Sequence, residues 1–125
     1  MEEEDKDLLR SVITAAEYIY ENLGCGHSET IYHNAMLHQL KKKHSCESEV
    51  IVPICLDGDY CGYCRCDIIV DKRIILELKA ISKTIFLRTD NEVIQIKNYI
   101  KFTGIKRGLL INFPKNGGPI IKIPL

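Results

Sequence analysis

The sequence has no apolar run that approaches the ~20 residues needed to span a bilayer. Its acidic start, Met-Glu-Glu-Glu-Asp, lacks the basic segment and apolar stretch of a secretory signal. It also lacks excess charge of either sign, since the formal net charge is zero, so the chain as a whole is no polycation. A local basic surface is still compatible with nucleic-acid binding. We expect an intracellular protein, cytoplasmic or nuclear, with no membrane partner.

A complete zinc-binding pattern is also missing. Cys61 and Cys64 have the spacing of zinc ligands, but no second pair of this kind follows, and all four histidines lie upstream. In an intracellular protein the six cysteines are expected to be reduced thiols. Cys64 and Cys66 are two residues apart and fit the inward-facing positions of a strand. Buried free thiols are therefore the favoured interpretation, and zinc is the alternative.

The pattern of apolar residues predicts one domain over residues 1–125 with a single core. Helical spacing indicates helices over 7–22, 28–43 and 91–102, and β-branched runs indicate strands over 49–56, 60–70, 74–79, 108–113 and 119–123. The last strand carries a proline, which favours a sheet edge. This order predicts an α/β fold with a central mixed sheet flanked by helices. The expected helix caps are Asp5, Ser28 and Asp90, and the second helix is expected to turn Ile31, Ala35, Met36 and Leu40 inward.

Residues 67–79 form the segment around which the chain is organised. Two apolar runs flank the polar residues 71–73, which predicts a β-hairpin. With a three-residue loop, Val70 pairs with Ile74 and Asp67 faces Glu77. A two-residue loop would place the two carboxylates on opposite sides of the sheet. We predict the three-residue loop.

The polar residues of this hairpin have two interpretations. Glu77 and Lys79 share a face of the strand because they are two residues apart. In the first interpretation Lys79 forms an ion pair with Glu77 or Asp67. In the second, the two carboxylates and a backbone carbonyl supply hard oxygen ligands for Mg²⁺, and Lys79 orients a water or stabilises negative charge on a phosphate.

A third carboxylate, Glu29, lies in the first turn of the second predicted helix. It either interacts favourably with the helix dipole or contributes an acidic group to the same site. Tyr32 is one turn further on and is expected to point the same way, and Gln95 and Tyr99 share one face of the third helix. Arg65 shares a strand face with Asp67 and has two open roles, pairing with that carboxylate or contacting phosphate.

Basic residues near the third helix are candidates for a nucleic-acid contact. They either line a phosphate backbone or belong to an ordinary solvated face. The residues are Lys97, Lys101, Lys106 and Arg107.

Taken together, these segments resemble a known family. Asp67 followed by Glu77-Leu78-Lys79 after a short hairpin looks like the D…(D/E)xK core of the PD-(D/E)XK nuclease superfamily, although Cys66 stands where the name has proline. The segment from Gly26 to Met36 resembles the GxxExxY family of that superfamily. So do Ala80 after the lysine, the Gln95-x-x-x-Tyr99 spacing, the Thr103-Gly104 helix stop and the run Gly108-Leu-Leu-Ile-Asn-Phe113.

The resemblance implies a restriction-endonuclease-like fold and a Mg²⁺- or Mn²⁺-dependent nuclease that acts on DNA. It implies that Asp67, Glu77 and the Leu78 carbonyl bind the metal, and that Glu29 joins through a water or a second ion. Lys79 then polarises the water or phosphate, Gln95 assists, and Tyr32 and Tyr99 are supporting residues. Where the family often carries a histidine, Glu92 stands near that place.

Two further hypotheses stay open at this stage. The fold is also compatible with a catalytically silent module that acts in nucleic-acid binding or protein assembly, because the chain is neutral and small. A nuclease of this size, without an accessory domain, is expected to work as a homodimer or with a recombination or repair partner.

Overall fold

The structure, a computed structural model, describes residues 2–82 and 91–125. Their strands form one five-stranded sheet in the order β1-β2-β3-β4-β5. β3 and β4 are parallel, and the other neighbours are antiparallel. The predicted α/β fold with a mixed sheet is therefore confirmed, including β5 at an edge. In chain order the elements are α1 (Glu3–Leu23), α2 (Glu29–Leu40), β1 (Cys46–Leu56), β2 (Asp59–Val70), β3 (Ile74–Lys79), α3 (Asn91–Thr103), β4 (Arg107–Asn112) and β5 (Ile121–Pro124).

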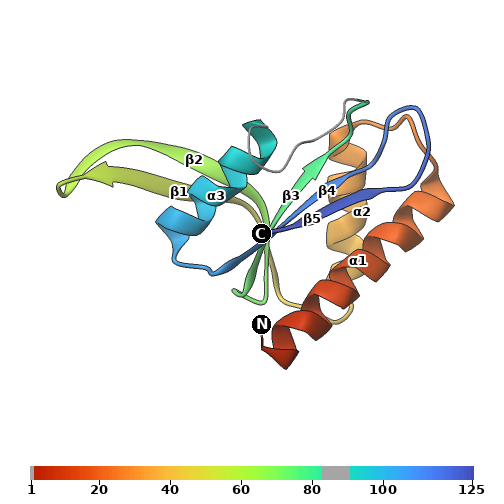
Figure 1. Cartoon of the computed structure of the whole chain (residues 1–125), viewed down its shortest axis with the longest axis horizontal. Helices are drawn as coiled ribbons and strands as arrows, with labels where there is room; N and C mark the ends of the chain where they lie inside the picture. Colours follow the sequence, from red (N-terminus) through yellow and green to blue (C-terminus); the bar gives the residue numbers. More distant parts are fainter. Residues whose placement is uncertain (1, 83–90) are drawn as a thin grey trace.

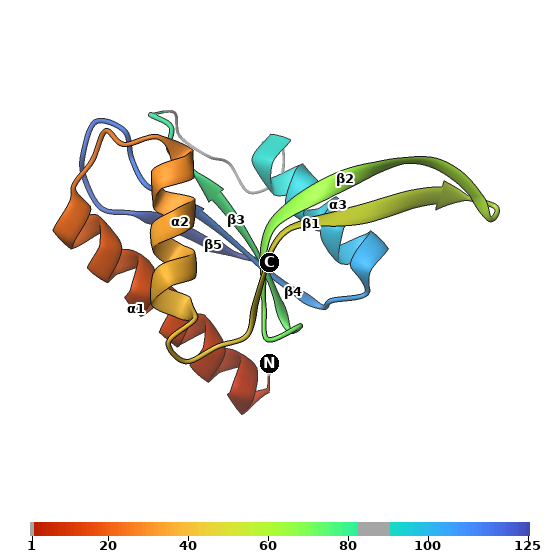
Figure 2. The ribbon, with the colours of Figure 1, turned by 180° about the vertical axis from the view of Figure 1, so that it is seen from behind.

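Helices cover both faces of the sheet, as Figure 1 and the reverse view in Figure 2 show. Val12 of α1, Met36 of α2 and Leu76 of β3 belong to one buried cluster. Ile75 of β3 packs with Ile96 of α3 in a second cluster on the other face. Successive side chains of a strand point to opposite faces, so β3 is apolar on both sides and lies at the centre of the sheet.

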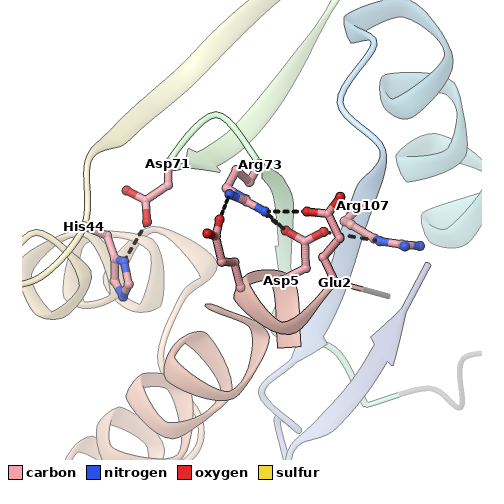
Figure 3. Close-up of polar contacts among 7 residues, drawn as sticks. Glu2, Asp5, His44, Asp71, Arg73 and Arg107 are labelled. Carbon is pink, nitrogen blue, oxygen red and sulfur yellow. Dashed lines mark hydrogen bonds and ion pairs between the residues drawn. The ribbon is translucent and has the colours of Figure 1, made fainter. Parts of the chain in front are cut away.

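The first helix begins at Glu3, earlier than the predicted residue 7. Asp5 lies within its first turn and is not the cap, which is a correction to the sequence-based expectation. The Asp5 carboxylate accepts a 2.9 Å hydrogen bond from Arg73 Nε at the β2–β3 loop (Figure 3). Acidic side chains also interact favourably with the N-terminal end of the helix dipole, and both effects extend the helix at this end.

The second helix is capped by Ser28, as predicted, whose side chain accepts a hydrogen bond from the Ile31 backbone nitrogen. It ends at Leu40 and not at residue 43. Its buried stripe is Tyr32, Met36 and Leu40, which recur every four residues. Ile31 is adjacent to this stripe and is 44% exposed, so its predicted inward position is wrong.

The strands β1 and β2 form a long hairpin that extends past the rest of the sheet (Figure 1). Its turn contains Asp57 and Gly58 at φ 50° and 84°. Two consecutive residues with positive φ match the right-handed twist of a hairpin. β1 begins at Cys46, three residues before the predicted start, because it continues along β2 as far as Val70.

The cysteines are free thiols, and their burial varies. Cys66 is buried and Cys64 is half-buried, which agrees with the inward-facing prediction for these two positions, and Cys61 is exposed. The predicted cap Asp90 lies outside the described residues. None of the described helices has the length and apolar character required to cross a membrane.

Candidate metal and phosphate site

The register of the β2–β3 hairpin decides whether the two key carboxylates meet. Ile68 pairs with Leu76 and Val70 pairs with Ile74, so the loop has the three predicted residues. Asp71 and Lys72 in this loop have φ values of 52° and 54°. The paired residues end at Ile68 and Leu76, one residue short of Asp67 and Glu77. The same register, if continued by one residue, would bring these two carboxylates opposite each other, as the sequence predicts.

The Asp67 carboxylate is fixed to the neighbouring strand. Its Oδ2 accepts a 2.9 Å hydrogen bond from the Leu78 backbone nitrogen. Leu78 itself is buried in the core on the α1–α2 side. Asp67 is therefore held against β3 between the positions of Glu77 and Lys79.

Glu77 is one of the two buried polar residues of the described chain and is only 2% exposed. Its Oε2 atom has no hydrogen-bond partner among the described residues. Burial raises the pKa of its carboxyl group to about 8, and the nearby Asp67 carboxylate adds to the increase, while Lys79 opposes it. A carboxylate buried in this way is costly unless a positive charge compensates it.

Lys79 provides part of that compensation. Its Nζ lies 3.7 Å from Oε1 of Glu77. This is the ion pair that the first interpretation of the hairpin expected. The distance is too long for a strong hydrogen bond, and it leaves the second carboxylate oxygen unsatisfied.

Glu29 approaches the same region from the start of α2. Partial burial raises the pKa of its carboxyl group. The positive charge of Lys79 opposes this increase, and the negative charge of Asp67 reinforces it. Glu29 and Asp67 together line a hollow of about 520 Å³. The sequence-based prediction gave no individual role to the other polar residues of its wall: Thr30, His33, Asn34, Ser48 and Glu49.

Within the described residues, no three His, Cys, Asp or Glu side chains are close enough together to hold a metal ion. The structure brings Asp67 and Glu77 onto adjacent strands and leaves Glu29 across the hollow, at the helix start.

Gln95 and Tyr99 of α3 form a supporting hydrogen-bond chain. Gln95 Nε2 donates to the Tyr99 hydroxyl over 2.7 Å, and this hydroxyl donates to the Arg65 carbonyl over 2.7 Å. Burial raises the pKa of Tyr99, and the negative charge of Glu77 contributes to the shift. These two hydrogen bonds fix α3 to the backbone of β2, two residues before Asp67. The Arg65 side chain is exposed.

Tyr32 supports the loop that precedes α2. Its hydroxyl donates to the Gly24 carbonyl over 2.7 Å, and its ring stacks on Phe113 with centroids 4.3 Å apart. Tyr32 is 1% exposed, while Glu29 is exposed one turn earlier, and their shared direction stays a prediction.

Asn112 is the second buried polar residue, and the sequence-based analysis missed it. It pairs with Lys79 in the parallel β3–β4 ladder. Its side chain accepts from the Ile81 nitrogen at 2.9 Å and donates to the Ile81 oxygen at 3.0 Å. A single polar residue inside the apolar run 108–113 was the available signal.

The basic residues proposed for nucleic-acid contact lie on α3 and at, or just before, the start of β4. Lys97 and Lys101 are exposed on α3. Arg107 pairs with Ile74, at the opposite end of β3 from Lys79, and its Nε lies 3.8 Å from the Asp5 carboxylate. Arg107 therefore lies beside Asp5 at the far end of β3 from Lys79, and its contact with nucleic acid stays a prediction.

A mixed sheet flanked by helices, with two carboxylates and a lysine gathered at one hairpin, is the arrangement of the restriction-endonuclease-like fold. The family model of the PD-(D/E)XK nuclease superfamily matches residues 6–122, and the chain belongs to this superfamily. The protein in the crystal structure of SSO0001 has a similar fold, which matches 97% of the present chain with a TM-score of 0.57 and 22% sequence identity. The match covers 56% of SSO0001, so the chain spans little more than half of that protein's length. A comparison with curated protein sequences finds no match.

Proposed function

We propose that this protein is a nuclease that hydrolyses phosphodiester bonds in DNA with the help of Mg²⁺ or Mn²⁺. The observation that carries the proposal is Glu77, which is 2% exposed, adjoins a second carboxylate and has an Oε2 atom with no partner among the described residues. A divalent cation would satisfy this oxygen and favour the ionised carboxylate. The two carboxylates of Asp67 and Glu77 therefore fit a metal ion whose remaining ligands are a backbone carbonyl and water.

The ligands would be Asp67, Glu77 and the Leu78 carbonyl, all oxygen donors suited to Mg²⁺. Glu29 would complete the acidic set through a water or a second ion. When bound, the metal supplies charge neutralisation at the phosphate and lowers the pKa of a water. Membership of the narrower GxxExxY family is part of this proposal and assigns the same role to Glu29.

The other side chains have separate tasks. Lys79 Nζ, already 3.7 Å from Glu77 Oε1, would stabilise the negative charge that develops on the phosphate. Gln95 would help to place phosphate or water from α3, and Tyr99 holds its amide in position. Lys97 and Lys101 would contact the phosphate backbone from the exposed side of α3.

The test is a panel of single-stranded, duplex and branched DNA incubated with Mg²⁺, Mn²⁺ or EDTA. We expect metal-dependent cleavage that Glu77→Ala or Lys79→Ala reduces by about 100-fold or more. Glu47→Ala and Lys115→Ala are matched controls, because both side chains are exposed and outside the site.

Cleavage by the Glu77→Ala and Lys79→Ala proteins at the wild-type rate would contradict the proposal. Absence of hydrolysis on every substrate would favour the second candidate, a silent nuclease-fold module in nucleic-acid binding or protein assembly. The lack of a three-ligand cluster in the described chain is the observation that favours this alternative. A homodimer or a recombination or repair partner remains part of the proposal, and light scattering tests the dimer.

A further inference from the structure

Three polar side chains far from the carboxylate site form a continuous hydrogen-bond relay. Ser11 Oγ lies 2.8 Å from His44 Nε2, and His44 Nδ1 lies 2.8 Å from Asp71 Oδ2 (Figure 3 shows the second contact). The three residues come from α1, from the connection between α2 and β1, and from the β2–β3 loop. The proposed nuclease reaction uses none of them.

The relay has a defined direction. A carboxylate only accepts hydrogen bonds, so His44 Nδ1 donates to Asp71. In neutral His44 the other nitrogen, Nε2, is then the acceptor, and the Ser11 hydroxyl donates to it. This is the order of groups in which an imidazole acts as a general base toward a serine and a carboxylate orients the imidazole.

The orienting carboxylate is itself fixed. Asp71 Oδ1 accepts from the Ser45 backbone nitrogen over 2.8 Å, and the Asp71 backbone nitrogen donates to the Ser45 oxygen over 2.8 Å. The His44 side chain is 15% exposed, so bulk water has little access to its ring. The base is therefore held in one orientation before any ligand arrives.

A hollow of about 460 Å³ gives access to the nucleophile and the base. Ser11 and His44 both line it, together with three cationic side chains, Arg10, Lys42 and Lys43, and one carboxylate, Asp7, which lies 3.2 Å from Arg10. We propose that Ser11 is an activated nucleophile at a second catalytic site, which hydrolyses small carboxylic esters that carry a negative charge. The excess of positive charge on the wall, three cations against one carboxylate, selects the anionic substrate by charge complementarity.

In the reaction, Ser11 Oγ bonds to the ester carbonyl carbon while its proton moves to His44 Nε2. The carbon–oxygen bond to the alcohol then breaks, and the departing alcohol takes the proton from Nε2. A water molecule repeats both transfers, releases the acid and restores Ser11. Backbone N–H groups around Ser11 are engaged in α1, so the cationic side chains of the wall stabilise the oxyanion.

A second serine–histidine pair, Ser48 and His33, provides a comparison for this site. His33 Nε2 lies 2.9 Å from Ser48 Oγ, which nearly reproduces the Ser11–His44 distance. In the part of the chain that the structure describes, no carboxylate is hydrogen-bonded to the His33 ring. If the aspartate activates the relay, Ser11 reacts and Ser48 does not.

The first experiment treats the whole protein with a fluorophosphonate probe in EDTA and locates the modified serine by peptide mass spectrometry. We expect Ser11 to be modified about 100-fold faster than Ser48. Equal modification of the two serines, or none at Ser11, would overturn the proposal. Because EDTA removes metal, this outcome is independent of the nuclease reaction.

The second experiment compares Asp71→Asn with Asp57→Asn. Asp57 is the matched control because it is a turn aspartate with a φ of 50°, against 52° for Asp71. Asparagine retains an acceptor for the Ser45 N–H but not the charge that stabilises the imidazolium. We expect Ser11 labelling and hydrolysis of 4-nitrophenyl hemisuccinate to fall about 10³-fold or more in Asp71→Asn only. An unchanged rate in Asp71→Asn would show that the relay is purely structural.

Specificity is checked with the same assay. Neutral 4-nitrophenyl acetate should be a poorer substrate than the hemisuccinate, and Lys43→Ala should narrow that difference by raising KM for the anionic ester. An equal preference for both esters in the wild-type protein would contradict the anionic substrate class.

Discussion

The Leu78 backbone nitrogen donates a 2.9 Å hydrogen bond to Oδ2 of Asp67, which joins the end of one central strand to the next. This bond holds the Asp67 carboxylate beside Glu77. It also gives Asp67 a structural role that is separable from its proposed role as a metal ligand.

Asp67→Asn is expected to separate the two roles. The asparagine oxygen can still accept from Leu78, so the midpoint of urea unfolding should change little, while DNA cleavage should fall by about 100-fold or more. Asp67→Ala should lose cleavage and also about 1–2 kcal/mol of unfolding free energy, because the Leu78 N–H loses its acceptor. Wild-type cleavage by Asp67→Asn would remove Asp67 from the metal site.

The raised pKa of Glu77 makes stability depend on pH. Its carboxyl group has a pKa of about 8 in the native protein against a usual 4.5. Between these values the native state holds a proton that the unfolded state has lost, so the unfolding free energy falls as the pH rises from about 4.5 to about 8. Chemical unfolding across this range should show a decrease of a few kcal/mol that Glu77→Gln removes. Glu47→Gln, an exposed control, should retain it.

Metal addition should reverse the loss of unfolding free energy that occurs as the pH rises. Because Mg²⁺ or Mn²⁺ requires the ionised carboxylate, either ion should raise the melting temperature more at pH 8 than at pH 5. Thermal unfolding with and without EDTA measures the effect. An equal increase in the Glu77→Gln protein would show that the ion binds elsewhere.

Tyr99→Phe tests the support that α3 gives to the site. The phenol hydroxyl bridges Gln95 and the Arg65 carbonyl, and its removal leaves both groups without that partner. We expect a loss of about 1–3 kcal/mol in unfolding free energy and a moderate loss of cleavage. Tyr63→Phe is the control, since Tyr63 is 61% exposed. Equal effects of the two substitutions would argue against a specific role for Tyr99.

Asn112→Ala tests the segment that follows Lys79. Two hydrogen bonds from Asn112 hold Ile81, and the alanine leaves the Ile81 backbone groups without these partners. Unfolding free energy should fall by about 2 kcal/mol, and cleavage should fall as Lys79 loses its support. Asn98→Ala, on the exposed side of α3, should change neither.

Local patterns were sufficient for most of the fold. The three-residue loop, the strand face that Glu77 shares with Lys79, and the Ser28 cap all depend on residues near one another in sequence. Two of the errors lie at element ends, where distant contacts compete: Arg73 extends α1 through Asp5, and β2 extends β1 to Cys46.

The sequence by itself determined the order of helices and strands and the face that Glu77 shares with Lys79, because strand and helix periodicity are properties of neighbouring residues. Only the tertiary structure decided that Glu77 has a buried oxygen without a described partner, that Arg107 turns to Asp5, and that Ser11, His44 and Asp71 meet. Burial and contacts of this kind depend on segments that are remote along the chain and adjacent only after packing.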